Sequence, residues 1–226
     1  MKKIVRLAVL GATALLLPIN AALAAPSSQF DKPADEPTGI GNTVGLEYSQ
    51  SNEFKKLFSS AVADGRKACD QYLKDHPGAS DMCIVSDLDE TLLDNREHFS
   101  SIQKFDWDKF VDWVNEAKAP SLKPTANLLE WARKKGFAIF FVTGRPEELR
   151  SATIKNLVKN GIAYDGLYLR PKDDKRSAIE IKTAYRKQIE DMGFKVVVNI
   201  GDQVSDLVGG YAVDCEKLPN KIYFIN

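Results

Sequence analysis

Two carboxylic acids lie two residues apart in the segment Asp87-Leu88-Asp89-Glu90-Thr91, directly after the apolar run 82–86. Carboxylates this close repel each other unless a cation, a shared proton or separate chemical roles offset the repulsion. An aspartate can attack phosphorus and form an aspartyl-phosphate, and a second acid can protonate the leaving oxygen and then deprotonate the attacking water. The pair therefore indicates cation binding, phosphoryl chemistry or both, with Asp87 and Asp89 as the candidate groups.

Two more polar clusters follow apolar runs further along the chain. Thr143-Gly144-Arg145 follows the run 137–142, and Asp202 and Asp206 follow the run 195–200. If these runs are neighbouring strands, four acids converge, and a hard cation with oxygen ligands, Mg²⁺, would offset their charge and that of a phosphate. The hydroxyl of Thr143 and the amide of Gly144 can hold phosphate oxygens.

A lysine is expected as a further clamp on the phosphoryl charge. Lys182 is the best placed, because it lies in the predicted helix that precedes the run 195–200. Lys172 and Lys175 are the alternatives, but they fall in a polar loop and we expect them to face solvent.

The elements that position these residues alternate between strand and helix. Strands are predicted at residues 82–86, 137–142, 167–169, 195–200 and 221–225. Helices are predicted at residues 44–76, 124–135, 146–160 and 176–192. This alternation indicates an α/β fold with a doubly wound parallel sheet, N-terminal helices and a small helical insert. In such sheets ligands bind beyond the carboxyl ends of the strands, where all three polar clusters fall.

The N-terminus has the pattern of an export signal. A positively charged start precedes the apolar run 7–17, and Ala22-Leu23-Ala24 gives a small-x-small cleavage pattern. An uncleaved membrane anchor is the alternative, but the run is short for a span, which needs roughly 20 residues. We expect a signal peptide at 1–24 cleaved after Ala24, a flexible leader at 25–43, and a periplasmic or secreted protein with no membrane segment.

Charge and histidine content exclude some classes of function. The chain has 31 basic and 31 acidic residues, and the signal takes away three basic residues and no acidic one, which leaves about −3. This weakly acidic balance argues against a nucleic-acid polymer as the partner and is compatible with a small phosphorylated substrate. The mature chain has two histidines, His76 and His98, and neither has the basic surroundings that a histidine nucleophile needs.

The three cysteines, Cys69, Cys83 and Cys215, allow one disulfide and leave one thiol over, and the sequence does not choose the pair. Cys83 falls in a predicted strand and is interpreted as a small core residue. The cysteine and histidine spacing contains no zinc pattern.

The combined motifs resemble a known family. Asp87-x-Asp89-x-Thr91, Thr143 after a strand, Lys182 and Gly201-Asp202-x-x-x-Asp206 are similar to the four motifs of the haloacid dehalogenase (HAD) superfamily. The finer pattern resembles subfamily IIIB, which includes bacterial class C acid phosphatases and plant vegetative storage proteins. The supporting segments are Leu93-Asp94-Asn95, residues 107–113, residues 141–145 and residues 201–206. The resemblance covers roughly residues 44–226, which we expect to form a single domain.

The resemblance implies a role for each motif residue. Asp87 would be the nucleophile and a magnesium ligand. Asp89 would be the general acid/base, with its backbone carbonyl on the metal. Thr143 and Lys182 would bind the phosphoryl group.

The same resemblance implies that Asp202 ligates magnesium and that Asp206 supports the metal directly or through water. The chain departs from the class C pattern in two places. It has no Cys at the signal cleavage site, and its second motif reads Thr-Gly-Arg where class C members often have Thr-Asn-Arg. The second departure leaves open whether Arg145 has a functional or a structural role.

Residues 95–123 are too short for a large cap domain and are expected to form a small cap-like insert beside an open site. An open site is compatible with hydrolysis of small phosphomonoesters, including nucleoside monophosphates. Trp107, Phe110 and Trp113 lie on one helical face and either cover the substrate or belong to the core. Contact of His98 with the substrate is also left open.

Three other functions are compatible with parts of the sequence. A phosphotransferase would pass the same aspartyl-phosphate to an alcohol. A non-catalytic storage or binding protein is less compatible with the presence of both Asp87 and Asp89. A calcium loop at residues 87–98 is disfavoured because Leu92 stands where such a loop needs Gly and His98 stands where it needs Glu.

Overall fold

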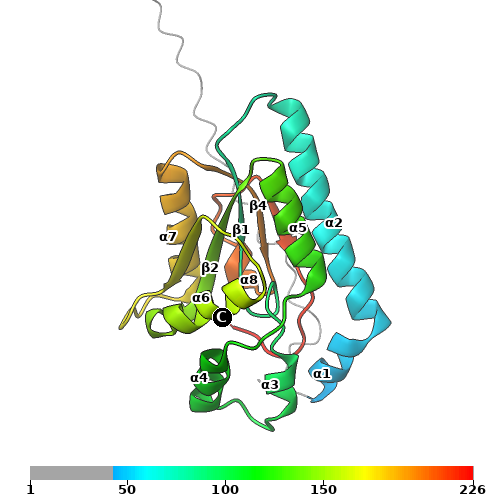
Figure 1. Cartoon of the computed structure of the whole chain (residues 1–226), viewed down its shortest axis with the longest axis vertical. Coiled ribbons are helices and arrows are strands. Elements are labelled where there is room, and N and C mark those ends of the chain that lie inside the picture. Colours follow the sequence, from blue (N-terminus) through cyan, green and yellow to red (C-terminus); the bar gives the residue numbers. More distant parts are fainter. Residues whose placement is uncertain (1–42, 226) are drawn as a thin grey trace, which may run out of the picture.

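The centre of the structure is a parallel sheet of five strands (Figure 1). The computed structural model describes residues 43–225. The strands are β1 (Met82–Ser86), β2 (Ala138–Pro146), β3 (Gly166–Arg170), β4 (Lys195–Gly201) and β5 (Asp214–Lys217). Their order is β3-β2-β1-β4-β5, so β1 lies between β2 and β4. The order confirms the predicted α/β fold with a doubly wound parallel sheet.

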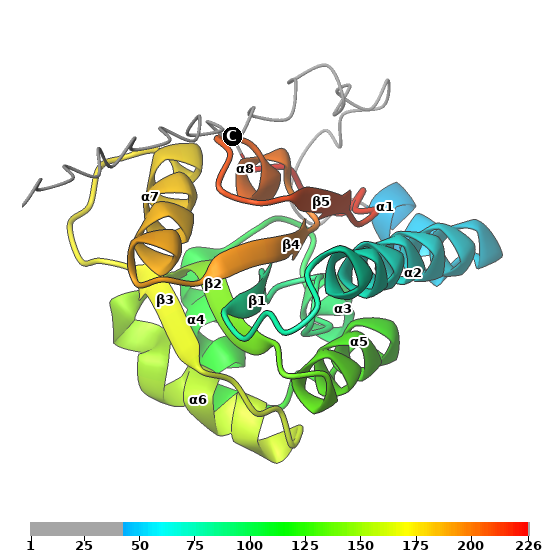
Figure 2. The same ribbon diagram turned by 90° about the horizontal axis from the view of Figure 1, so that it is seen from above.

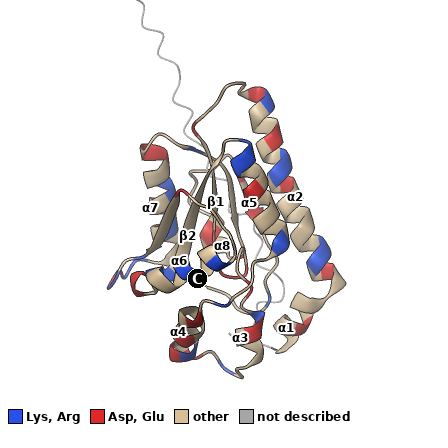
Figure 3. Ribbon diagram, viewed as in Figure 1, with Lys and Arg blue, Asp and Glu red and all other residues tan. Residues whose placement is uncertain are grey.

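Helices cover both faces of this sheet. Those in the described residues are α1 (Thr43–Gln50), α2 (Asn52–Asp75), α3 (Arg96–Ser100), α4 (Trp107–Glu116), α5 (Lys123–Lys134), the 3₁₀ turn η2 (Glu147–Leu149), α6 (Arg150–Lys159), α7 (Ala178–Asp191) and α8 (Val204–Leu207). Figure 2 shows α2, α5 and α6 on one face and α7 on the other. Acidic and basic residues are interspersed along α2 and α5 (Figure 3), as expected for helices with one solvent-exposed side.

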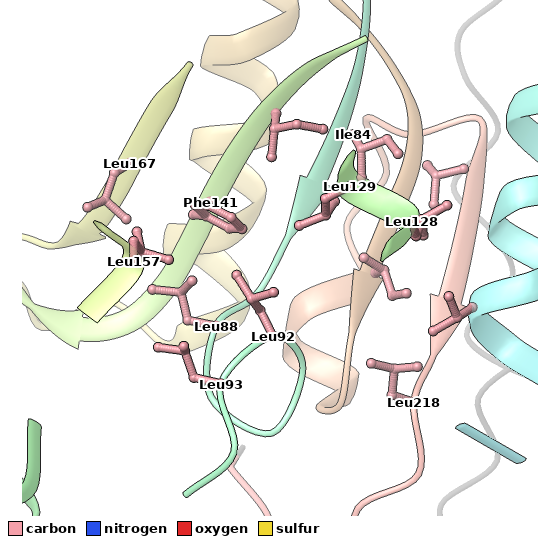
Figure 4. Packing of buried hydrophobic residues seen from close by; sticks show 14 of the residues in the cluster. Ile84, Leu88, Leu92, Leu93, Leu128, Leu129, Phe141, Leu157, Leu167 and Leu218 are labelled. Atoms are coloured by element: carbon pink, nitrogen blue, oxygen red, sulfur yellow. The ribbon is translucent and has the colours of Figure 1, made fainter. Parts of the chain in front are cut away.

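The central strands β1, β2 and β4 contain apolar runs because each side of the sheet has its own core. Alternate residues of β1 enter different clusters: Ile84 packs with residues of α5 such as Leu128, and Val85 packs with Ile189 of α7. Figure 4 shows the first cluster, in which Phe141 of β2 and Leu157 of α6 lie with Ile84. Burial on both faces therefore accounts for the uninterrupted apolar runs of the sequence.

The insert between β1 and α5 folds into the short helices α3 and α4. Figure 1 shows both helices beyond the carboxyl ends of the strands. The three polar clusters lie at this edge of the sheet. Asp106 caps the N-terminus of α4, because its side chain accepts a hydrogen bond from the backbone N–H of Lys109. Burial of Phe110, Trp113 and Val114 fixes this helix against the rest of the molecule.

The predicted strand at 221–225 is wrong, and the fifth strand is Asp214–Lys217. Strand β5 lies at the sheet edge and is only half-buried, so its sequence shows no apolar run. The apolar character of residues 221–225 has another cause, because Ile222 and Tyr223 pack against Phe99 of α3.

Other boundaries differ by a few residues. The predicted helix at 44–76 is two helices separated at Ser51, whose side chain caps α2 by accepting from the backbone N–H of Phe54. The predicted helix at 146–160 begins with the turn η2, because Pro146 still belongs to β2.

All three cysteines lie in the described residues and are free. Cys83 is fully buried in β1, as predicted for a core residue. Between residues 43 and 225, none of the helices has both the length and the apolar character required to cross a membrane. The predicted signal peptide at 1–24 and the predicted leader up to residue 42 lie outside the described residues.

Candidate functional site

The adjacent ends of β1, β2 and β4 bring the three polar clusters together. Ser86, the last residue of β1, is in register with Phe141 of β2 and Ile200 of β4. The next residue, Asp87, continues the ladder, because its backbone N–H donates to the carbonyl of Ile200 at 3.0 Å. Strand pairing therefore places Asp87 beside the residues that follow Ile200.

A closed loop after β1 fixes the two acids of the first motif. Leu88 is fully buried, together with Leu92 and Leu93 (Figure 4). The backbone N–H groups of Leu92 and Leu93 both donate to the carbonyl of Leu88, at 2.9 and 2.7 Å. The apolar residues of the segment thus anchor the loop in the core and hold Asp87 and Asp89 on either side of Leu88.

Asp87, Asp202 and Asp206 form a buried acidic cluster. Carboxylate oxygens of the three residues lie within 4.8 Å of one another. Burial raises the pKa of Asp87 well above its usual value, and the charges of Asp206 and Asp202 act in the same direction. Burial and the charge of Asp206 also raise the pKa of Asp202 to about 6.

Lys182 is the cation nearest to this cluster. Its Nζ lies 3.0 Å from Oδ1 of Asp87 and also donates to Oδ1 of Asp206. Burial opposes the charge of Lys182, but the two carboxylates raise its pKa above the usual value. One ammonium group leaves three neighbouring carboxylates with excess negative charge. Their hard oxygen donors therefore fit a divalent cation.

Asp202 is held by a set of side-chain donors. Thr91 Oγ1 donates to Oδ1 of Asp202 at 3.0 Å, and the amides of Gln203 and Asn220 donate to Oδ2 at 2.6 and 2.7 Å. Lys217 Nζ donates to the backbone carbonyl of Asp202 at 2.5 Å. These contacts orient the carboxylate and assign a structural role to Thr91 of the first motif.

The side chain of Asp89 lies outside this acidic cluster and pairs with Arg145. Nη2 of Arg145 lies 2.6 Å from Oδ1 of Asp89, and Nε lies 3.0 Å from Oδ2. Asn95 Nδ2 adds a donor at 2.8 Å. Burial would raise the pKa of Asp89, but the charge and hydrogen bonds of Arg145, with Asn95, hold it below its usual value.

Thr143 and Gly144 lie at the same end of the sheet. The hydroxyl of Thr143 is buried and accepts from the backbone N–H of Arg145 at 3.2 Å. Gly144 is exposed, and a Cβ built on it would meet no atom within 4 Å. The backbone beside Gly144 therefore opens toward space that a ligand can use. Lys172 and Lys175 are exposed, as predicted.

A cavity of about 150 Å³ opens over these residues, with Asp87, Asp89, Gly144 and Lys182 among its lining. Much of the remaining wall is aromatic and comes from the insert and the C-terminal segment: Phe99, Phe105, Trp107, Phe110 and Tyr223. The arrangement combines a charged region that suits a phosphoryl group with an apolar wall that suits a planar organic group.

The lining of this cavity shows which aromatic residues of the insert can contact a substrate and which belong to the core. Trp107 and Phe110 line it, whereas Trp113 is a core residue whose indole N–H donates to Oδ1 of Asn95 at 2.8 Å. His98 is buried among Phe99, Phe110 and Trp113 and does not line the cavity.

A sequence comparison decides the family. Residues 38–226 match the family model described as HAD superfamily, subfamily IIIB (Acid phosphatase). The chain belongs to this family. The predicted resemblance is therefore confirmed, over a range that includes all described residues.

Three curated relatives of this subfamily IIIB chain are plant proteins. "Acid phosphatase 1" of Solanum lycopersicum is 38% identical over 148 residues, which are 62% of this chain and 58% of the relative. "Stem 28 kDa glycoprotein" of Glycine max is 34% identical over 151 residues, which are 63% of this chain and 59% of the relative. "Vegetative storage protein 1" of Arabidopsis thaliana is 27% identical over 147 residues, 62% of this chain and 54% of the relative. The matches thus span less than two thirds of each relative.

Among solved structures, the subfamily IIIB fold is similar to the class C acid phosphatase from Bacillus anthracis with tungstate bound. The TM-score is 0.70 at 24% sequence identity, with 80% of this chain and 84% of that chain covered. This likeness supports the α/β fold assignment.

The contacts of several site residues of this HAD protein are not predicted by its sequence. Asn95 and Arg145 belong to the segments that carry the family resemblance, but the contact of Asn95 with Asp89 depends on the turn of the loop after β1, and that of Arg145 joins residues 56 positions apart. Tyr223 was assigned to a strand, whereas its hydroxyl donates to Oε2 of buried Glu90 at 2.6 Å. In the sequence, each of these residues is a polar group next to an apolar run. This pattern is too frequent in proteins to identify a site residue.

Proposed function

We propose that this protein is a magnesium-dependent acid phosphatase that hydrolyses small phosphomonoesters through an aspartyl-phosphate on Asp87. The observation that carries the proposal is the 3.0 Å contact of Lys182 Nζ with Asp87, inside a buried cluster of three aspartates. A buried nucleophile, a cationic clamp and oxygen donors for a metal are the parts that phosphoryl transfer requires.

In the first step an oxygen of Asp87 attacks phosphorus, and the bond from phosphorus to the leaving oxygen breaks. Asp89, in its protonated form, gives its proton to that oxygen. In the second step water attacks the phosphorus of the aspartyl-phosphate while Asp89 takes a proton from the water. The bond to Asp87 breaks, inorganic phosphate leaves and both acids return to their starting forms.

The phosphoryl oxygens are bound by the Thr143 hydroxyl, the Gly144 backbone amide and Lys182. Asp87, Asp202 and Asp206, with the backbone carbonyl of Asp89, would hold Mg²⁺, which would neutralise negative charge on the phosphoryl group. The close grouping of the three carboxylates supports this ligand set.

The leaving group lies against the aromatic wall of the cavity, which suits a planar apolar group such as a nucleoside. The protein acts outside the cytoplasm, in the periplasm or as a secreted enzyme. This part of the proposal rests on the signal-like pattern of residues 1–24.

The proposal is tested by a magnesium-dependent phosphatase assay of the wild type and Asp87→Asn. The variant keeps the shape of the side chain but removes the nucleophilic carboxylate, so activity falls to background. Asp191→Asn is the matched control, because Asp191 is an exposed residue at the C-terminal end of α7, away from the cavity lining. Equal activity in wild type and Asp87→Asn would overturn the mechanism.

Storage proteins among the plant relatives make a non-catalytic role the second candidate. The same assay separates the two, since a storage protein shows no magnesium-dependent turnover in the wild type. Product analysis with added glycerol distinguishes hydrolysis from transfer, because a phosphotransferase yields glycerol phosphate.

A further inference from the structure

Three basic side chains line the cavity above Asp87: Arg145, Arg170 and Lys182. Two of them are already paired with carboxylates. Arg145 forms the ion pair with Asp89, and Lys182 contacts Asp87 at 3.0 Å. The third basic side chain, Arg170, takes part in neither of these contacts.

Arg170 is the last residue of β3, and its own loop holds it in place. Its Nη1 donates to the backbone carbonyl of Arg176 at 2.8 Å and to that of Asp174 at 3.4 Å. Between residues 43 and 225, no carboxylate lies within ion-pair distance of Arg170, and its Nε and Nη2 have no hydrogen-bond partner. A guanidinium has five N–H donors, so one nitrogen anchors the side chain and the others are available to a ligand.

The charge of Arg170 acts on the neighbouring acid, Asp174, but it is the smallest of the influences that lower the pKa of that carboxyl. The carboxylate of Asp174 is taken by Arg176, with 2.6 Å between Nη2 of Arg176 and Oδ2 of Asp174. The remaining acids of the cavity lining are Asp87 and Asp89, which have Lys182 and Arg145 as partners. Within residues 43–225, Arg170 is therefore a cation of the cavity lining that has no ion-pair partner.

We propose that Arg170 binds a second anionic group, a phosphate or a carboxylate, carried by the leaving group of the substrate. The inference rests on the proposed phosphatase function and narrows its substrate class to phosphomonoesters with another negative charge. The planar fork of arginine suits both anions, because each presents two oxygens to paired N–H donors. The aromatic wall would hold the body of the substrate between the two charged ends.

The experiment compares substrate pairs that differ in one anionic group. The first pair is phenyl phosphate and 4-carboxyphenyl phosphate. The second pair is adenosine 5′-monophosphate and adenosine 3′,5′-bisphosphate, for which release of the 5′ phosphate is measured. The wild type is expected to show a kcat/KM about tenfold or more higher for the charged member of at least one pair, equivalent to about 1.4 kcal/mol. If the charged substrate is preferred in just one of the two pairs, that pair identifies the anion, carboxylate or phosphate, that Arg170 binds.

Arg170→Gln is the test variant, since its amide retains a donor for the loop carbonyls while the charge is lost. The preference ratio is expected to fall at least fivefold. Lys172→Met is the matched control: it removes a positive charge from the same loop, but Lys172 does not line the cavity, and the ratio is expected to stay at the wild-type value.

Two results would overturn the inference alone: a wild type that hydrolyses phenyl phosphate without preferring either charged partner, or an equal loss of preference in Arg170→Gln and Lys172→Met. The absence of a preference in the wild type overturns the inference without any variant, even if Arg170→Gln fails to fold. A wild type that hydrolyses none of the four compounds would overturn the proposed function, and the inference with it.

Discussion

The guanidinium of Arg145 forms a two-point ion pair with the carboxylate of Asp89, at 2.6 Å for Nη2 to Oδ1 and 3.0 Å for Nε to Oδ2. Thr153 of α6 accepts from Nη1 of Arg145 at 3.2 Å, so the guanidinium is itself held in place. The pair keeps the proposed general acid/base in one orientation and, by lowering its pKa, favours the ionised form. Asp89 is thereby prepared to act as a base and must gain a proton before it acts as an acid.

Arg145→Lys is expected to lower kcat by tenfold or more, because a lysine keeps the charge but cannot make the two-point contact. General acid catalysis is worth about 10²–10⁴-fold, and it matters most for poor leaving groups. The loss is therefore expected to be larger for an alkyl phosphate than for p-nitrophenyl phosphate. Steady-state kinetics on both esters would check this. A loss of equal size on the two would contradict a role for Arg145 in positioning Asp89.

Trp113→Phe is expected to destabilise the fold by about 1–3 kcal/mol, the range for a buried polar group that loses its partner. The substitution retains the ring but removes the N–H that donates to Oδ1 of Asn95, a fully buried residue. Because Asn95 also donates to Asp89, kcat should fall as well. Urea denaturation and kinetics measure both effects. Trp131→Phe, at a half-buried site outside the cavity lining, should leave kcat at the wild-type value.

The sequence was sufficient to predict the positions of Asp87, Thr143 and Asp202 relative to the sheet. Strands buried on both faces contain apolar runs, so the polar residues that follow a run mark the edge of the sheet. Strand β2 itself continues beyond its apolar run, through Thr143 and Gly144 to Pro146. Parallel strands then bring these polar residues to one edge, which the register of β1 with β2 and β4 bears out.

The partners of these residues could not be predicted in the same way. Asp89 meets Arg145 because β2 continues to Pro146 beside the loop that follows β1, and it meets Asn95 because that loop turns back after the first motif. The local pattern around each residue contains no trace of either contact. Strand β5 was missed for a related reason. An edge strand needs no apolar run, and its pairing with β4 is set by the rest of the sheet.

Magnesium is expected to raise the melting temperature of the wild type, because a cation that binds between three buried carboxylates binds only the folded chain. At a concentration one hundred times Kd the stabilisation is about 2.7 kcal/mol. Asp202→Asn removes one proposed ligand and should abolish most of the shift. Thermal unfolding with Mg²⁺ and with a chelator measures this shift in melting temperature independently of catalytic activity. An equal shift in wild type and Asp202→Asn would exclude Asp202 as a ligand.

Glu216 on β5, which does not line the cavity, provides a pH-dependent contribution to stability. Burial raises the pKa of Glu216 to about 8, and the charges of Asp214 and Asp64 act in the same direction, partly offset by Lys67. The folded state therefore retains a proton that the unfolded state releases near the ordinary glutamate pKa of about 4.3. Stability from this group is complete below that value and is lost as the pH rises toward 8.

Glu216→Gln, which stays neutral, should remove this dependence. Its melting temperature is expected to exceed that of the wild type increasingly as the pH rises from about 5 to 8, within the window between the two pKa values. Glu130→Gln is the control, because Glu130 is an exposed residue of α5 in an ion pair with Lys134. Parallel melting-temperature profiles for wild type and Glu216→Gln across this range would show that Glu216 ionises in the folded state as it does in the unfolded chain.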